Sequence, residues 1–199
     1  MKSYPKYTII YQICYIPKTD HQYHIDLYDG IHKLYPDNII KKELKNSCDW
    51  VTIMDEIITE CKNNNSIVPI LHIDTHGCKD GFGISTSPLI SWFALIFKIK
   101  ELNEVCNGNL FLSLNVCEGL LIYRNRPDGC EVKDISLNTI GSCDKINTVY
   151  GKNCFLAMYT EYFNSYSMDK AIQMFFNENR IIERQPIPFV LIDNYIHDQ

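Results

Sequence analysis

Two apolar segments of the chain each end at a side chain that can take part in covalent chemistry. Residues 70–75, ILHIDT, lead directly into His76 and Gly77, and residues 110–116, LFLSLNV, lead into Cys117, which Gly119 follows two positions later. A thiol is a weak nucleophile until it loses its proton, and histidine is the side chain that titrates near neutral pH. The two segments therefore predict a cysteine nucleophile and a histidine base.

The same residues suggest a division of roles. Cys117 attacks a carbonyl carbon, and His76 activates the thiol or protonates the leaving amine. The oxygen that becomes negative needs N–H donors, which the backbone of Gly77 and of Cys117 would supply as the oxyanion site. Cys117 follows His76 by 41 positions, a gap that one loop, one helix and one strand would fill. Parallel strands place their carboxyl ends at one edge of a sheet, so adjacent strands would bring both side chains together.

On these motifs the chain resembles the caspase-like cysteine peptidases, the group that includes caspases, metacaspases, separases and the bacterial CHAT proteins. The family pattern is an apolar strand ending in His-Gly and a second one ending in a block with the nucleophilic Cys. Residues 115–119, NVCEG, share Cys and the second Gly with the caspase block Gln-Ala-Cys-x-Gly, and the CHAT form is closer. The resemblance covers residues 67–119, with weaker support to about 177. It implies an α/β fold, a caspase-like three-layer sandwich with a central, mostly parallel β-sheet flanked by helices.

The resemblance also indicates a substrate pocket, although two departures leave its specificity open. It implies that Asn115, Ser142 and Asp144 bind substrate, since the strand at 135–140 and the loop after it would lie beside the pocket. Asn115 stands where metacaspases carry the Asp that holds Arg or Lys, and no arginines match those with which caspases accept Asp. Asp144 would supply a negative charge for a basic substrate side chain, or it is a solvated loop residue.

Periodicity and turn residues predict the elements that must position these groups. Buried strands are expected at 8–16, 67–73, 110–116, 135–140 and 189–192, with a weaker alternating segment at 23–28 that stops at Asp29-Gly30. Residues 31–46 are expected to form a loop with a short helix. Amphipathic helices are expected at 50–61, at 88–106 with Ser87 as cap and Gly108 at the end, at 155–163, and at 168–176 with Ser167 as cap. Strands that alternate with helices favour a parallel sheet.

Composition restricts the classes of function. The 199 residues fit a single domain over 1–199, and a net charge of −5 without a basic run argues against nucleic acid and membrane surfaces as partners. The longest apolar stretch, at 89–97, is shorter than the ~20 residues of a membrane span, and residues 1–7 predict no secretory signal. Nine scattered cysteines without a CxxC motif favour reduced thiols and a cytoplasmic location.

Less specific interpretations compete with several of these residues. His72, His76, Cys78 and Cys117 could be imagined as a zinc site, but His72 and His76 would lie ~13 Å apart along a strand, so no metal is expected. His72 is expected to be a core histidine, and Trp92, Phe93 and Phe97 are expected to form a core stripe. Cys78 is the main competing thiol. No cofactor is predicted.

The predicted function is a regulated cysteine endopeptidase that acts on a protein or peptide, with bacterial defence or cell death as the role the resemblance suggests. An activating partner protein or a small signalling ligand would order the loops at 77–87 and 120–134. Arg124, Arg126 and Lys133 are expected to be exposed in the second loop. They would make it a site of proteolytic processing if the substrate side chain is basic, or they are simply solvated charges. The alternatives are a catalytically silent scaffold or ligand-binding module of the same fold, and a thiol hydrolase or acyltransferase that acts on a small molecule.

Overall fold

A six-stranded sheet forms the middle layer of the protein. The computed structural model describes residues 7–15, 21–83, 88–182 and 189–193. The strands lie in the order β2-β1-β3-β7-β8-β9, and every neighbouring pair is parallel except β8 and β9. Their bounds are β1 (Tyr7–Cys14), β2 (Ile39–Glu43), β3 (Ile67–Asp74), β7 (Phe111–Asn115), β8 (Asn138–Ser142) and β9 (Phe189–Asp193). The predicted α/β class with a mostly parallel sheet is confirmed.

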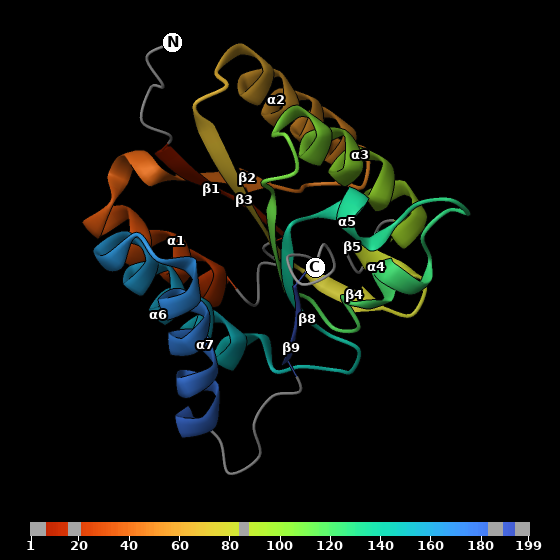
Figure 1. The fold of residues 1–199 in the computed structure, drawn as a ribbon. Helices are drawn as coiled ribbons and strands as arrows, with labels where there is room; N and C mark the ends of the chain where they lie inside the picture. The colour runs from red at the N-terminus through yellow and green to blue at the C-terminus, as the bar shows by residue number, and fades with distance from the viewer. Residues whose placement is uncertain (1–6, 16–20, 84–87, 183–188, 194–199) are drawn as a thin grey trace.

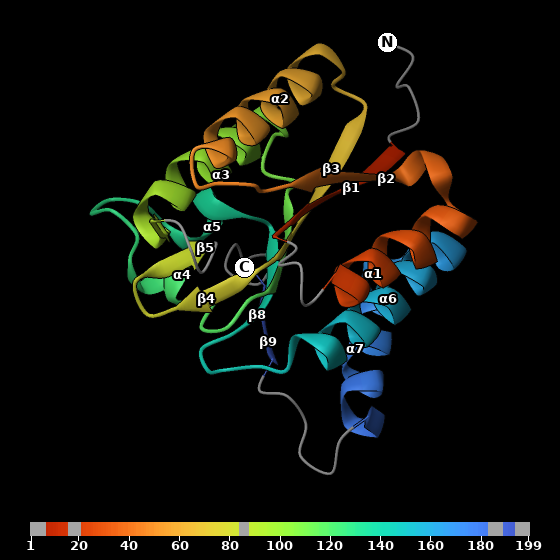
Figure 2. The same cartoon turned by 180° about the vertical axis from the view of Figure 1, so that it is seen from behind.

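Helices cover both faces of this sheet (Figures 1 and 2). One face carries α1 (His21–Leu34), α6 (Thr148–Ser165) and α7 (Met168–Ile182), and the other carries α2 (Asp49–Asn63) and α3 (Trp92–Val105). Strand residues alternate between two cores: Tyr11 of β1 packs with Trp50 below α2 and α3, whereas Ile10 packs with Phe155 below α6. Burial on both faces explains why the central strands are continuous apolar runs.

Helices α2 and α3 are held by their apolar faces and their caps. The α2 face packs into the first core through Trp50, Ile53, Met54, Ile57, Ile58 and Cys61, as its spacing predicts. The predicted start of α3 was wrong: the helix begins at Trp92, where the Ser91 hydroxyl accepts the Ala94 amide at 3.1 Å. Ser87 lies outside the described residues. Gly108 ends the helix as expected, with a φ of 74° and an amide that donates to the Asn103 carbonyl at 2.8 Å.

The remaining expectations are confirmed in part. Helices α6 and α7 extend beyond the predicted 155–163 and 168–176, and the Ser167 hydroxyl caps α7 by accepting the Lys170 amide at 3.4 Å. Strand β8 begins three residues later than predicted, because Ile135 ends the short helix α5 (Val132–Ile135). The glycine-rich segment after β3 forms an antiparallel sheet of β4 (His76–Cys78), β5 (Gly81–Gly83) and β6 (Ile90–Ser91).

Two segments differ from the sequence prediction. Residues 23–28 belong to α1 and not to a strand, and Gly30 lies inside that helix, where an added Cβ would meet Leu156 Cδ1 at 2.9 Å. The glycine serves close packing of α1 on α6, so the turn signal at Asp29-Gly30 was misleading. Residues 31–46 contain a 3₁₀ turn (Pro36–Asn38) and the edge strand β2. The strand was not predicted because its two lysines interrupt the apolar pattern.

The predicted aromatic stripe on α3 is only partly a core feature. Trp92 is buried, and its indole donates to the Cys78 carbonyl at 3.0 Å. Phe93 and Phe97 are 49% and 55% exposed and pack edge to face on each other, so assigning them to the core was wrong. The helix turns these two rings away from the sheet, on the side opposite Leu95 and Ile99.

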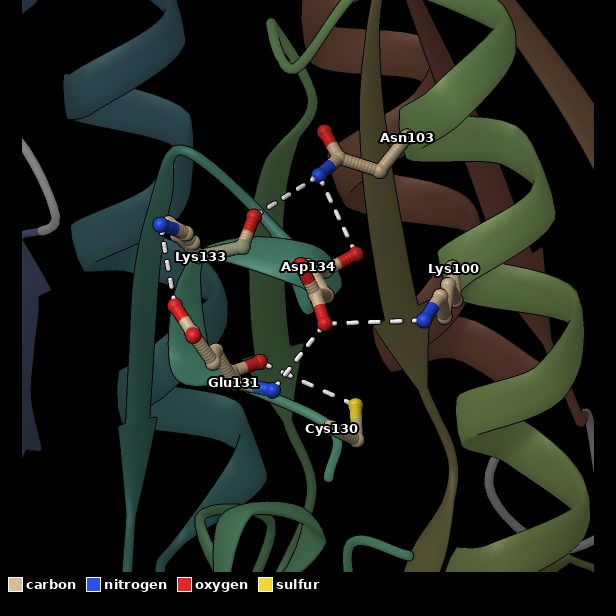
Figure 3. Close-up of polar contacts among 6 residues, drawn as sticks. All are labelled: Lys100, Asn103, Cys130, Glu131, Lys133 and Asp134. Atoms are coloured by element: carbon tan, nitrogen blue, oxygen red, sulfur yellow. Dashed lines mark hydrogen bonds and ion pairs between the residues drawn. The ribbon is translucent and has the colours of Figure 1, made fainter.

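The segment between β7 and β8 is more regular than an exposed loop, since it contains α4 (Leu121–Arg124) and α5. A set of polar contacts fastens it to α3 (Figure 3). Asn103 Nδ2 donates to the carbonyls of Lys133 at 3.0 Å and Asp134 at 3.2 Å, and Lys100 Nζ lies 3.5 Å from Asp134 Oδ2. The Asp134 carboxylate also accepts the Glu131 amide at 3.0 Å. This segment is therefore anchored to α3 near the amino ends of β7 and β8.

Candidate active site

His76 and Cys117 follow two strands that are neighbours in the sheet. β3 and β7 pair in parallel with Asp74 opposite Asn115, so both reactive residues lie just past the same carboxyl edge. The chain order reverses next to this pair, between β1 and β3, since β1 has β2 on one side and β3 on the other. Open parallel sheets form their ligand crevices at such switch points. The predicted adjacency of the two strands is confirmed.

Gly77 brings the histidine segment into contact with the cysteine segment. A Cβ added at Gly77 would lie 2.2 Å from the Cys117 carbonyl oxygen and 2.3 Å from Val116 Cγ1, distances that real Cβ atoms do not show. Only glycine allows the two backbones to approach this closely. The glycine beside His76 thus has a structural reason, which is the packing of its own backbone against the backbone of Cys117. Its role as an oxyanion donor stays a prediction.

The Cys117 thiol is half-buried and contacts the loop after β8. Its Sγ donates to the Ile146 carbonyl at 3.7 Å and accepts the Ile146 amide at 3.4 Å. The loop therefore holds the sulfur through one donor and one acceptor of the same residue.

The His76 ring is open to solvent and lies against Tyr15. It is exposed, and its ring centroid lies 6.1 Å from that of Tyr15, which follows β1. Among the described residues, no hydrogen bond joins the His76 ring to the Cys117 thiol. The backbones of the two segments are in close contact, whereas the His76 ring packs against Tyr15 and not against the thiol.

Asn115 lies behind the thiol and is fully buried. Its Nδ2 donates to Asp74 Oδ1 at 3.0 Å, and a Cβ at Gly151 of α6 would meet Asn115 Oδ1 at 2.1 Å. The Asp74–Asn115 pair therefore locks the ends of β3 and β7 beneath the site, and α6 closes over it. The predicted contact of Asn115 with substrate stays a prediction. A fully buried side chain of this kind supports the strand ends.

Ser142 and Asp144 are joined to the segment that follows Cys117. The Ser142 and Asp144 carbonyls accept the amides of Leu120 and Glu118, each at 2.9 Å, and the Ser142 hydroxyl accepts the Asp144 amide at 3.0 Å. Ser142 is buried, whereas the Asp144 side chain is exposed beside the thiol segment. The structure thus brings both residues to the site, with only Asp144 presented to solvent.

Glu118 is a residue of this site that the sequence reasoning missed. Its φ of 58° is a left-handed conformation that non-glycine residues rarely adopt. Its Oε2 atom is buried and has no hydrogen-bond partner among the described residues. Strained backbone and unmatched polar atoms concentrate at functional sites. The signal available in the sequence was the position between Cys117 and Gly119, but nothing in the pattern indicates a positive φ.

The other thiols have less favourable surroundings for chemistry. Burial, and then the neighbouring Asp74 carboxylate, raise the pKa of the Cys14 thiol to about 12. Burial also raises the pKa of Cys130, which donates to the Glu131 carbonyl at 3.7 Å. Cys78 is half-buried in β4, and Cys48 and Cys143 are exposed. Neutral buried thiols are inert, so Cys14 and Cys130 do not compete with Cys117.

His72 is a core histidine, as the sequence predicts. It is fully buried, its Nδ1 lies 2.8 Å from the Tyr159 hydroxyl, and its ring packs on Phe155. Within the described part of the chain, no group of three or more His, Cys, Asp or Glu side chains is arranged to hold a metal ion.

No helix in the described ranges is long and apolar enough to cross a membrane. No family model matches the chain, and no curated protein matches it either.

Proposed function

We propose that this protein is a caspase-like cysteine endopeptidase in which Cys117 is the nucleophile and His76 the base. The observation that carries the proposal is the contact of Gly77 with the Cys117 backbone, in which the segment that contains His76 meets the segment that contains Cys117 beyond two adjacent strands. A cysteine with a purely structural role at a strand end does not need a His-Gly segment so close to it that the glycine has no room for a methyl group. The partners of such an enzyme are a protein or peptide substrate and an activator.

The chemistry follows from these positions. The Cys117 sulfur bonds to the carbonyl carbon of the scissile peptide while His76 takes the thiol proton, and backbone N–H groups at Gly77 and Cys117 hold the oxyanion. The C–N bond then breaks, and the proton on His76 passes to the leaving amine. Water attacks the resulting thioester, which releases the acid and restores the thiol. Asp144, exposed beside the site, is the charged group available to a basic substrate side chain.

Two further elements of the proposal concern regulation and location. The contact of Ile146 with the Cys117 thiol must loosen for substrate to reach the sulfur, and an activating protein or small signalling ligand would favour that movement. All nine cysteines are free, which is typical of a reducing compartment such as the cytoplasm. An effector protease of bacterial defence or cell death fits both the need for an activator and the cytoplasmic location.

The experiment compares thiol reactivity within one molecule. Limiting iodoacetamide, followed by peptide mass spectrometry, measures the labelling rate of Cys117 against the exposed Cys48 and Cys143. We expect Cys117 to react at least tenfold faster and to fall to their rate in His76→Ala. The matched control is His32→Ala, an exposed histidine on α1 that stacks on Tyr28. Equal labelling of all three thiols in the wild type, with and without candidate partners, would overturn the dyad.

A second candidate, a silent scaffold of the same architecture, is favoured by one observation. The His76 ring contacts Tyr15 and the thiol is already engaged by Ile146. Cleavage of a peptide library by the wild type, and its loss in Cys117→Ala, separates the peptidase from the scaffold. Fast labelling with no cleavage of any peptide would instead point to a thiol hydrolase for a small molecule.

A further inference from the structure

A cavity of about 830 Å³ opens at the edge of the sheet opposite the candidate active site. It lies where the parallel strands begin, with Val68 of β3, Phe111 of β7 and Asn138 of β8 in its lining. The turn from α6 to α7 forms another side, through Tyr166 and Met168. The volume is in the range of small-molecule sites, which is roughly 300–1,000 Å³. Cys117 and His76 take no part in it, so the cavity is separate from the proposed catalysis.

Apolar side chains line part of the cavity. Ile70 and Phe111 are almost fully buried on the sheet, and Ile172 of α7 and Leu191 of β9 add aliphatic surface. Such a surface binds the carbon body of a ligand by removing it from water. The lining also holds polar groups that can fix an orientation, among them the Thr8 and Tyr162 hydroxyls, which hydrogen-bond to each other at 2.6 Å.

The charged residues in the described part of the lining have one sign. Asp169 and Asp193 contribute carboxylates, and the described lining contains no lysine, arginine or histidine. Asp193 Oδ1 accepts the Asn138 amide at 2.9 Å when that amide is oriented to satisfy its neighbours. Asp169 is exposed in the first turn of α7. A ligand with negative charge would be repelled here, whereas a cation would be attracted.

Two tyrosine rings supply the second feature that suits a cation. Tyr162 and Tyr166 have ring centroids 6.5 Å apart at an interplanar angle of 63°, and both line the cavity. Tyr166 is 80% exposed and has a φ of 50°. Asp169 lines the same cavity as the two rings. Aromatic faces attract ammonium groups within about 6 Å of the ring.

We propose that this cavity binds an organic cation: an ammonium group between Asp169 and the two tyrosine rings, carried by an aromatic or alkyl body that enters the apolar interior. A simple metal ion does not fit, since the described side chains form no group of three or more metal-binding residues. A neutral ligand would use the interior but leave the carboxylates and ring faces unused.

The test uses three probes with the same indole body and different charge. Tryptamine is cationic, tryptophol is neutral and indole-3-acetate is anionic at neutral pH. Binding to the full chain is followed by calorimetry and by NMR shifts of the amides around the cavity. We expect tryptamine to bind at least tenfold more tightly than tryptophol, and indole-3-acetate to bind most weakly. Equal affinities for the three probes, or shifts that lie elsewhere on the molecule, would overturn the proposal.

Variants connect the charge to a residue. Asp169→Asn should weaken tryptamine about tenfold and leave tryptophol unchanged. Asp128→Asn, which removes the same charge from an exposed loop outside the cavity, should change neither. Ile172→Trp should fill the interior and abolish binding of every probe. Denaturant unfolding of each variant confirms that it folds. If Asp169→Asn and Asp128→Asn weaken tryptamine equally, the attraction comes from the protein's net charge and the assigned site is wrong.

Discussion

The two edges of the central sheet are built in opposite ways. At the carboxyl edge, Gly77 and Gly151 lie so close to Cys117 and Asn115 that neither position has room for a methyl group. At the amino edge, the sheet and the α6–α7 turn leave a cavity of about 830 Å³. The same strands, β3 and β7, run from one edge to the other. One scaffold thus separates a place of fixed backbone geometry, which the proposed covalent chemistry needs, from a place with room for a ligand.

The largest expected effect comes from a single methyl group at the tight edge. Gly77→Ala should lower the free energy of unfolding by about 3 kcal/mol, because its Cβ would overlap backbone and core atoms that cannot move freely. Urea denaturation measures this change. The control is Gly129→Ala, where no atom lies within 4 Å of the added Cβ and only a φ of 78° opposes it, so the cost should be about 1 kcal/mol. Equal costs would show that the contact at Gly77 is not rigid.

Each edge also contains one Asn–Asp pair, and these pairs should differ in strength. Asn115→Ala should cost about 2–3 kcal/mol, since it removes a buried donor from Asp74 and leaves a void. Asn138→Ala should cost about 1 kcal/mol, because its partner Asp193 is only half-buried beside the cavity. Chemical denaturation of both variants gives the comparison, and a larger loss at Asn138 would contradict it.

Cys14 makes the tight edge sensitive to alkaline pH. Its pKa is raised to about 12 by burial and by Asp74, whereas an unfolded thiol titrates near 9. The unfolded chain therefore loses its proton first, and the stability that the neutral thiol provides is complete below pH 9 and declines between pH 9 and 12. From pH 7 to pH 10 the wild type should lose about 1.4 kcal/mol more than Cys14→Ala. Parallel loss in both proteins would mean that Cys14 ionises freely in the folded state.

The smallest effect is expected where a larger side chain has room. Ile172→Phe adds several carbon atoms at the wall of the cavity and should change the free energy of unfolding by less than about 1 kcal/mol. Thermal and urea unfolding both report it. A loss as large as that of Gly77→Ala would show that the amino edge is as tightly packed as the carboxyl edge.

The sequence predicted the parts of this molecule that are governed by local pattern. Continuous apolar runs identified β3 and β7 and therefore the positions of His76 and Cys117, because strands buried on both faces have that composition. The period of α2 and the cap at Ser167 were equally local. Together they were sufficient to predict a mostly parallel sheet with His76 and Cys117 just past one edge.

The features that escaped prediction depend on contacts between distant segments. Gly30 indicated a turn but serves the packing of α1 on α6, and Phe93 and Phe97 have a core composition on an exposed helix face. The contact of Ile146 with Cys117 joins residues 29 positions apart. The left-handed Glu118 follows from the tight turn after β7. None of these contacts produces a periodic pattern in the sequence from which it could be predicted.

The contact at Gly77 also has a consequence for recognising relatives of this chain. A glycine that is required by a backbone oxygen 2.2 Å from its would-be Cβ cannot be exchanged without reshaping the sheet edge. Any protein that descends from the same ancestor and keeps this architecture must therefore keep that glycine, however far the rest of its sequence has diverged. Distant kinship would be visible as a spacing of small residues around His76 and Cys117 rather than as overall identity.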